Sequence, residues 1–308
     1  MSIESGPWDV RRLPLAEGKT FLVTGGNAGI GYFVAEQLAG TGATVVLGSR
    51  DQTKADAATA SIRSHVPHAR VRHLPLDLTD TESLKTAGAR LAIDRLDALV
   101  CNAGVLFEEP SRRENPDGQE LMFATNHLAH FALTGWLAPL LAEGRVVTTG
   151  SLVAKSARLD VDDLRYTRGY EPKEAYSRSK LAQMLFGFEL DRRLRASGSR
   201  TSSIVNHPGG ALDSLTPSRP PVHVRSTGTR LRGLPSGALL QGKHAGAWPA
   251  VRAVLDPSAQ GGQLWRPRVF GLRGVPTLEP VKGKLADTEL AARVWAASVE
   301  LTGVDPFA

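Results

Sequence analysis

The chain has 308 residues, of which 42% are hydrophobic and 22% charged, so it is long enough to bury a sizeable core. The net charge is +6, but the arginines are scattered without a basic run or interleaved aromatics, which disfavours a nucleic-acid-binding protein. No apolar run approaches the roughly 18 residues of a membrane span, Met1–Glu17 lacks a signal peptide's apolar core, and the single cysteine, Cys101, indicates a reducing cytoplasm.

Apolar runs that suit β-strands alternate with helical periods along most of the chain. The predicted strands are 19–24, 44–48, 70–76, 96–101, 145–149 and 202–206, with a further one at 263–265. The first predicted helix follows the glycine-rich turn 25–31 and runs to about residue 39. Further helices are predicted at 51–65, from residue 80, and at 120–143, 176–197, 243–255 and 287–301. Near-continuous apolar strands separated by helices are typical of a parallel sheet covered on both faces. We therefore predict one doubly wound, Rossmann-like α/β domain that spans residues 1–308.

Two stretches depart from this regularity. Residues 107–118 are polar and charged and predict a surface loop. Residues 208–242 contain five Pro, six Gly and five Arg or His among short apolar fragments. Long irregular loops of this kind are often lids or substrate loops, so we predict a substrate loop at 209–242. The alternative is an insertion without a function of its own.

The turn between the first strand and the first helix reads Thr24-Gly25-Gly26-Asn27-Ala28-Gly29-Ile30-Gly31. Glycines allow the backbone to approach a pyrophosphate closely, and a helix N-terminus offers free N–H groups to it. This context predicts a dinucleotide site, whereas the alternative is glycines that only permit a tight turn. The predicted cofactor contacts in the turn are Gly25, Asn27, Gly29, Ile30 and Gly31.

The end of the second strand bears on the choice between cofactors. An NAD site places Asp or Glu there to hold the ribose hydroxyls, but this chain has Ser49 followed by Arg50. A small hydroxyl leaves room for a 2′-phosphate, and a guanidinium can pair with that phosphate. We therefore favour NADP over NAD as the cofactor. The alternative is that Arg50 is a surface residue that pairs with Asp51.

Tyr176 and Lys180 are four residues apart, so they share one face of the predicted helix. A free phenol has a pKa of about 10 and is a poor acid or base at neutral pH. An ammonium beside it favours the phenolate and lowers that pKa toward the working range. The pair is thus a candidate proton-transfer site, and the alternative is a surface tyrosine with a solvated lysine.

In combination, these motifs resemble the short-chain dehydrogenase/reductase family. The resemblance is to its single-domain branch, and within it to retinol-dehydrogenase-like and bacterial reductases. The matching segments, in family order, are Thr24–Gly31, Asp77-Leu78, Cys101-Asn102-Ala103-Gly104, Asn126-His127-Leu128-Ala129-His130-Phe131, Ser151, Tyr176–Lys180 and Pro208-Gly209. The resemblance as a whole runs from about residue 15 to residue 263.

The resemblance implies a catalytic role for four residues. Tyr176 would donate a proton to a carbonyl oxygen as hydride arrives, or remove it in the oxidative direction. Lys180 would lower the pKa of Tyr176 and bind the nicotinamide ribose. Ser151 would hold the substrate oxygen, and Asn126 would anchor a water that links Lys180 to solvent. Taken alone, Ser151 would be interpreted as a helix cap or turn residue.

The resemblance also implies cofactor contacts outside the glycine turn. They are Asp77, Leu78, Asn102, Ala103, Gly104, Tyr176, Lys180, Pro208 and Gly209, in addition to Ser49 and Arg50 at the end of the second strand. Asp77 would contact the adenine ring, although Asp77 and the segment after the fourth strand could serve only as turn residues. Many family members place a Thr after the Pro-Gly pair to grip the nicotinamide carboxamide. Here Asp213 stands near that place, so either Ser214 substitutes for the Thr or the contact is absent.

The sequence therefore predicts an NADP(H)-dependent oxidoreductase that acts on a small-molecule carbonyl or secondary alcohol. The rival from another class is a non-catalytic NADP-binding sensor or scaffold with the same fold. No metal ion and no nucleic acid are expected. Family members commonly pair through their long helices, here 120–143 and 176–197, so a homo-oligomer is an open prediction.

Overall fold

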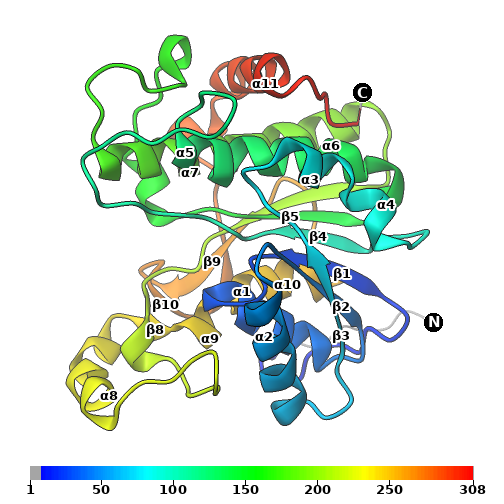
Figure 1. The fold of residues 1–308 in the computed structure, drawn as a ribbon, viewed down its shortest axis with the longest axis vertical. Coiled ribbons are helices and arrows are strands. Elements are labelled where there is room, and N and C mark those ends of the chain that lie inside the picture. The colour runs from blue at the N-terminus through cyan, green and yellow to red at the C-terminus, as the bar shows by residue number, and fades with distance from the viewer. Residues whose placement is uncertain (1–7, 308) are drawn as a thin grey trace.

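Eight strands form one sheet in the computed structural model, which describes residues 8–307 (Figure 1). The spatial order is β10-β9-β6-β5-β4-β1-β2-β3, and every neighbouring pair is parallel except β9 and β10. The strands are β1 Thr20–Thr24, β2 Thr44–Ser49, β3 Arg70–Pro75, β4 Ala98–Cys101, β5 Arg145–Thr149, β6 Ser202–Asn206, β9 Leu264–Val269 and β10 Arg273–Glu279. The signal-peptide prediction falls partly on residues 1–7, which lie outside the described residues.

Helices cover both faces of this sheet (Figure 1). One face carries α1 Gly29–Ala39, α2 Gln52–His65, α9 Lys243–Gly246 and α10 Trp248–Leu255. The other carries α3 Thr81–Lys85, α4 Ala87–Leu91, α5 Leu121–Phe123, α6 Ala129–Leu137 and α7 Pro172–Ala196, with α11 Thr288–Thr302 outside α7. This arrangement confirms the predicted doubly wound, Rossmann-like fold.

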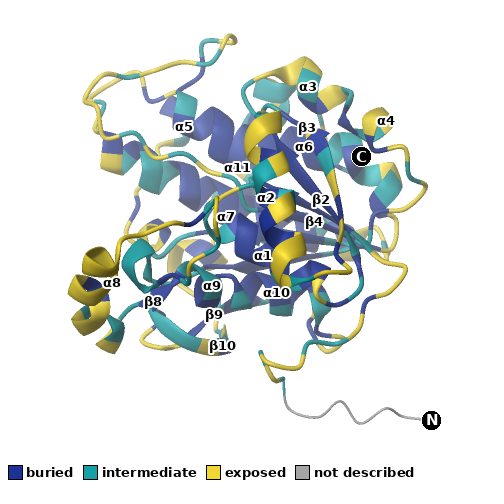
Figure 2. Cartoon of the chain, turned by 60° about the horizontal axis from the view of Figure 1, so that its bottom comes forward, coloured by how far each residue is buried: buried dark blue, intermediate teal, exposed yellow. Residues whose placement is uncertain are grey.

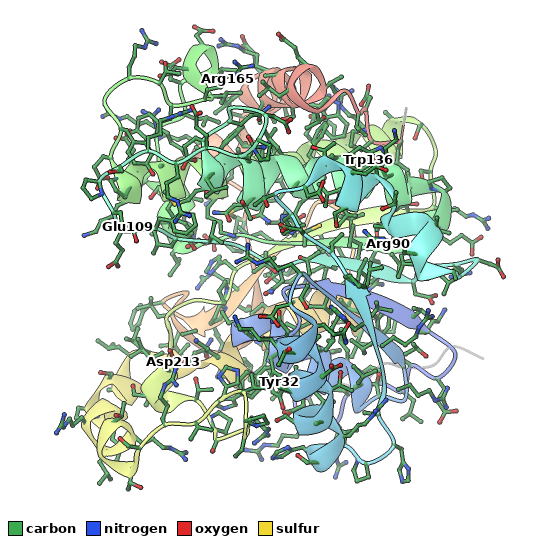
Figure 3. The ribbon with its side chains drawn as sticks, in the orientation of Figure 1. Tyr32, Arg90, Glu109, Trp136, Arg165 and Asp213 are labelled. Atoms are coloured by element: carbon green, nitrogen blue, oxygen red, sulfur yellow. The ribbon has the colours of Figure 1, made fainter. Side chains whose placement is uncertain are left out.

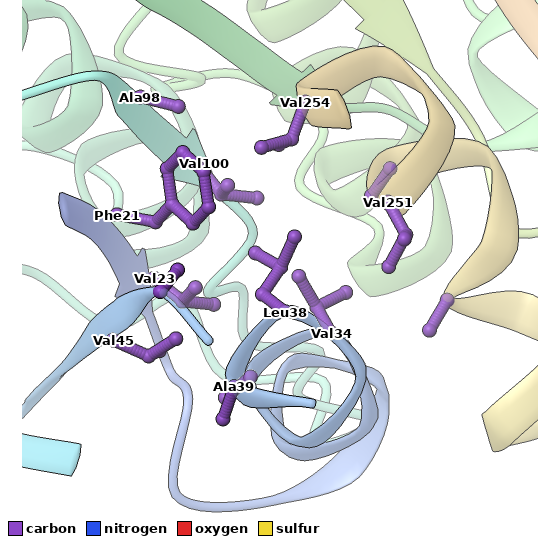
Figure 4. Packing of buried hydrophobic residues seen from close by; sticks show 14 of the residues in the cluster. Phe21, Val23, Val34, Leu38, Ala39, Val45, Ala98, Val100, Val251 and Val254 are labelled. Carbon is purple, nitrogen blue, oxygen red and sulfur yellow. The ribbon is translucent and has the colours of Figure 1, made fainter. Parts of the chain in front are cut away.

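The alternation of side chains along the strands explains why both faces are buried. On β1, Phe21 and Val23 face the cluster beneath α1 and α10, whereas Leu22 belongs to the cluster on the α6 side. Figure 4 shows Val34 and Val251 from the two helices packed toward the strand residues. Full burial of such a side chain contributes about 1.5–3 kcal/mol, so the sheet is a rigid platform for the loops at its edge.

The structure corrects the sequence prediction at three elements. The helix predicted from residue 80 is two short helices, α3 and α4, joined at Thr86. The predicted helix 120–143 contains a π-helical turn, Ala124–Leu128, between α5 and α6, and ends in the 3-10 turn Ala138–Leu141. The edge strand β10 was not predicted, because Gly274 and Pro276 interrupt its apolar pattern.

The predicted substrate loop, 209–242, has secondary structure of its own. It contains β7 Ala211–Leu212, the 3-10 turns Asp213–Leu215 and Leu234–Ala238, α8 Thr227–Gly233 and β8 Gln241–Gly242. The Arg219 guanidinium donates to both carboxylate oxygens of Glu36 on α1, at 2.6 and 3.1 Å, and the His223 ring stacks on Phe33. Tyr32 of α1 and Asp213 of the loop accordingly lie on the same side of the sheet (Figure 3). The loop is therefore fastened to the glycine-turn helix.

The C-terminal helix bears on how copies of the chain can pair. Trp295 of α11 packs against Phe131 of α6 and Phe186 of α7, with ring centroids 4.9 and 5.9 Å apart. α11 thus occupies part of the outer surface of the two helices that the expected pairing would use.

Within residues 8–307, no helix is both long and apolar enough to cross a membrane.

Candidate active site

The predicted site residues gather at one edge of the sheet, where the parallel strands end. Strand-end segments supply most of them, after β1, β2, β3, β4, β5 and β6 in turn. The remainder come from the π-helical turn, which holds Asn126, and from the first part of α7, which holds Tyr176 and Lys180. In open α/β sheets, ligands bind outside the carboxyl ends of the strands.

Tyr176 and Ser151 meet at this edge. The α7 helix begins at Pro172, and the Glu171 side chain caps it by accepting from the backbone N–H of Glu174. Ser151 precedes the 3-10 turn Leu152–Lys155 without capping it through its side chain. Its hydroxyl lies close enough to the phenol of Tyr176 to influence the pKa of that group. Burial raises the pKa of Tyr176, and the Ser151 side chain only partly offsets the effect.

Lys180 does not bond to the phenol. Its side chain is buried, and its Nζ donates to Gln183 Oε1 at 2.8 Å and to the Thr149 carbonyl at 3.3 Å. Loss of hydration lowers the pKa of Lys180 to about 8. Burial dominates at the phenol in this geometry and the ammonium is directed elsewhere, so the lowering of the Tyr176 pKa by Lys180 stays a prediction.

Asn126 joins the β4 loop to α7. Its Nδ2 donates to the Val105 carbonyl at 3.0 Å and to Ser179 Oγ at 2.9 Å, and its Oδ1 accepts from the Val105 N–H at 2.7 Å. Gly104 lies beside this junction, where an added Cβ would stand 3.1 Å from Lys180 Nζ and 3.2 Å from Asn126 Oδ1. The close approach leaves no comfortable space for a larger residue at position 104.

The buried side chains behind Lys180 were not predicted from the sequence. Gln183 Nε2 donates to the Cys101 carbonyl at 3.3 Å, and the His130 ring lies next to Gln183. His130 Nδ1 is 3.1 Å from the Asn126 carbonyl and so carries the proton, which leaves Nε2 to accept from Thr24 Oγ1 at 2.9 Å. Burial lowers the pKa of His130 to about 4, so the ring is neutral.

This network extends from the lysine to the strand that enters the glycine turn. Two residue spacings in the sequence could have indicated this hydrogen-bond network. Gln183 stands three residues after Lys180, and His130 stands four residues after Asn126. Both spacings place the pairs on common helix faces.

The glycine turn fits the pyrophosphate of a dinucleotide. The N-cap position of α1 is Ala28, which makes no side-chain cap bond, and the first turn of α1 holds no acidic residue. An added Cβ at Gly31 would stand 2.4 Å from the Gly25 carbonyl, so only glycine allows this turn to close. Asn102 steadies the turn, since its Nδ2 donates to the Thr24 carbonyl at 3.0 Å. The first-turn N–H groups thus face the carboxyl edge without a competing side-chain acceptor.

The candidate adenosine end of the site lies after β2 and β3. Arg50 is exposed, and among the described residues its guanidinium makes no ion pair, whereas Asp51 pairs with Lys54 at 3.3 Å. The alternative that Arg50 pairs with Asp51 is therefore wrong. Asp77 Oδ1 accepts from the N–H and the hydroxyl of Thr79, which is the turn role that the sequence left open. Leu78 packs against the hydrophobic cluster beneath α3, so its side chain is directed into the protein.

The segment after β6 carries Pro208 and Gly209. Asp213, which stands near the position of the family's Thr, is engaged in two ion pairs. It pairs with Lys243 at 2.7 Å and with Arg225 at 3.2 Å. Ser214 packs against Gly233 of α8, where an added Cβ would clash with its hydroxyl. Within residues 8–307, no group of three or more His, Cys, Asp or Glu side chains is arranged to hold a metal ion.

Comparisons with known proteins agree with this geometry. The family model of short chain dehydrogenases matches residues 19–205. Mouse polyprenol dehydrogenase is 36% identical over 303 residues, which cover 94% of this chain and 86% of that protein. Human retinol dehydrogenase 13 is 34% identical over 295 residues, with the same two coverages, 94% and 86%.

Solved structures give the same result. An uncharacterized protein from Mycobacterium paratuberculosis has a TM-score of 0.79 and 32% identity, over 97% of this chain and 98% of that one. A short chain dehydrogenase from Shigella flexneri, solved in complex with NADP, has a TM-score of 0.60 and 25% identity, over 82% and 98%. The chain therefore belongs to the short-chain dehydrogenase/reductase family, in its retinol-dehydrogenase-like branch, and is an NAD(P)-dependent oxidoreductase that transfers hydride between an alcohol and a carbonyl group.

Proposed function

We propose that the protein is an NADP(H)-dependent oxidoreductase in which Tyr176 is the acid and base. The observation that carries the proposal is the placement of Ser151, after β5, beside Tyr176 of α7, at the sheet edge that also presents the glycine turn. A carbonyl oxygen placed between the two hydroxyls would be held by Ser151 and protonated by Tyr176. NADPH, when bound, supplies the hydride.

The electrostatics of the site suit the reductive direction. Because burial raises the pKa of Tyr176, the phenol keeps its proton at neutral pH and can release it to a developing alkoxide. Lys180, with its pKa lowered to about 8, can exchange a proton with solvent near neutral pH and so restore the phenol. Asn126 keeps Val105 and Ser179 in place around that lysine. The reverse reaction would be favoured at higher pH.

The proposed cofactor is NADP. The 2′-phosphate would lie against Ser49 and Arg50, since the hydroxyl is small and the guanidinium has no ion-pair partner among the described residues. The pyrophosphate would lie on the first turn of α1, with Asn102 and Gly104 lining the cleft. Arg50 is thus the residue on which the preference for NADP depends.

The proposed substrate is a lipophilic alcohol or its carbonyl form. Two relatives are named for polyprenol and retinol, both long apolar alcohols. Near the proposed site, Leu106 follows the β4 segment with 49% of its side chain exposed, and Val153 follows Ser151 with 38% exposed. Such a lining would favour an apolar chain next to the reacting group.

The proposed setting is the cytoplasm, which suits the buried, unpaired Cys101.

A substrate panel tests this function. NADPH consumption is measured with a long-chain or isoprenoid aldehyde, a short aldehyde and a sugar ketone, each over a concentration series. We expect the highest kcat/KM for the apolar aldehydes. NADPH that binds tightly but is not consumed with any member of the panel would instead support the non-catalytic sensor.

A further inference from the structure

Most exposed large apolar side chains lie in segments at the carboxyl edge of the sheet. Large hydrophobic side chains rarely form such groups on the surface of a monomer without a binding role. Of the eleven such side chains that are exposed in the described residues, eight follow the carboxyl ends of strands or lie on the substrate loop. They are Leu106, Val153, Val224, Leu231, Leu234, Leu239, Val269 and Phe270.

The densest part of this group is α8 with the turn that follows it. Leu231, Leu234 and Leu239 are 60%, 61% and 57% exposed, so more than half of each side chain lies in water. Figure 1 shows α8 at the outer end of the substrate loop, away from the central sheet, and Figure 2 shows the helix mostly in the colour of exposed residues. We call α8 with residues 234–239 the apolar tip.

The β9–β10 turn extends the apolar tip. The Arg273 guanidinium donates to the Gly237 and Ala238 carbonyls, at 2.9 Å in the second case, and so holds the turn against residues 234–238. Phe270, in that turn, is 80% exposed. The apolar tip and the turn that carries this phenyl ring are therefore held together, and Arg219 and Glu36 fasten the base of the loop to α1.

The charges on the substrate loop are mainly positive. Residues 209–242 contain four arginines, at 219, 225, 230 and 232, and one acidic residue, Asp213. Asp213 is paired with Arg225 and Lys243, whereas Arg230 and Arg232 are exposed and make no ion pair among the described residues. Apolar side chains flanked by free arginines suit an anionic lipid surface, where the apolar groups enter the acyl boundary and the guanidinium groups meet phosphates.

We propose that the apolar tip docks the protein on an anionic membrane surface, with the mouth of the active site facing the lipid. The attachment is peripheral, through α8, residues 234–239 and the β9–β10 turn. It adds a route for a lipophilic substrate to the proposed function, since an alcohol or aldehyde dissolved in the bilayer could enter without crossing water. Docking itself requires no turnover, so its test is independent of the reaction.

Vesicle flotation tests the proposal. Purified protein is mixed with phosphatidylcholine vesicles, with or without phosphatidylglycerol, and the fraction that floats is measured at low and at high salt. We expect flotation with the anionic vesicles, weaker binding at high salt, and little binding to phosphatidylcholine alone. Protein that stays unbound with anionic vesicles at low salt would overturn the proposal.

Variants locate the surface. The double variant Leu231→Ser with Leu234→Ser should weaken binding at least about tenfold, and Arg230→Gln with Arg232→Gln should remove most of the preference for anionic lipid. The matched control is Val275→Ser with Leu278→Ser, because these side chains are 37% and 47% exposed on the edge strand β10. Equal loss of vesicle binding in the control variant would contradict the assignment. So would a wild-type protein that forms a dimer, does not bind vesicles, and becomes monomeric only in the leucine variant. Unchanged unfolding temperatures would show that the variants are folded.

Discussion

The Lys180 ammonium donates a 2.8 Å hydrogen bond to the amide oxygen of Gln183 rather than to the phenol of Tyr176. Gln183 in turn donates to the Cys101 carbonyl and lies beside His130, which contacts Thr24 at the start of the glycine turn. Every side chain in this chain of contacts is buried. The position and the charge of the lysine are therefore set by the protein interior behind it.

Replacement of Gln183 should change the protonation of Lys180. A carboxylate in Gln183→Glu favours the ammonium and should raise the pKa of Lys180 from about 8, whereas Gln183→Met removes the acceptor and should not raise it. If the ammonium holds the nicotinamide ribose, NADPH affinity should fall as pH rises through that pKa. Titration of NADPH fluorescence against pH in the three proteins measures it. An inflection at the same pH in wild type and Gln183→Glu would contradict the prediction.

Removal of the buried charge at position 180 should stabilise the fold while it abolishes turnover. Below about pH 8 both the folded and the unfolded chain carry the proton, so the wild type bears the full cost of the buried ammonium. After allowance for the lost hydrogen bonds, Lys180→Met should gain about 1–2 kcal/mol in the free energy of unfolding at pH 7.

The pH dependence checks this assignment of the cost. Between about pH 8 and the unfolded pKa of 10.5, the unfolded wild type binds more protons, so its stability should rise and the difference between the two proteins should shrink. Urea unfolding at pH 7, which lies below this window, and at pH 9.5, which lies inside it, measures the difference in the free energy of unfolding. A variant that is less stable than wild type at pH 7 would show that the hydrogen bonds outweigh the buried charge.

Cofactor preference should depend on Arg50. We expect NADPH to bind at least several-fold tighter than NADH, and Arg50→Ala to remove most of that ratio, because the guanidinium is the only charged partner proposed for the 2′-phosphate. The matched control is Arg70→Ala, since Arg70 is exposed at the opposite end of the sheet, at the start of β3. Dissociation constants for both cofactors in the three proteins decide the matter. Equal affinities for NADPH and NADH in the wild type would refute the role of Arg50.

The strands and the clustering of the site could be predicted from the sequence for a simple physical reason. Buried parallel strands need apolar runs, and their carboxyl ends meet at one edge, so Ser151 after β5 and the turn after β1 had to be near each other. The π-helical turn at Asn126 could not be predicted, because the apolar period of residues 120–143 continues through it. Nor could β10, whose Gly274 and Pro276 resemble a loop.

The electrostatics of the site were the least accessible to sequence reasoning. The four-residue spacing of Tyr176 and Lys180 places the side chains on one face, but it does not state how deeply each is buried. Burial raises one pKa and lowers the other, and Gln183 captures the ammonium. These effects arise from tertiary packing around α7, not from the local motif.

The central claim is that Tyr176 transfers the proton in the reaction. Single-turnover reduction of an apolar aldehyde by Tyr176→Phe, with NADPH in excess, tests it most directly, with NADPH affinity measured on the same sample. We expect wild-type NADPH affinity and a rate lower by at least about a hundredfold, because the general acid is lost. A near-normal rate in Tyr176→Phe, with any aldehyde that the wild type reduces, would contradict it.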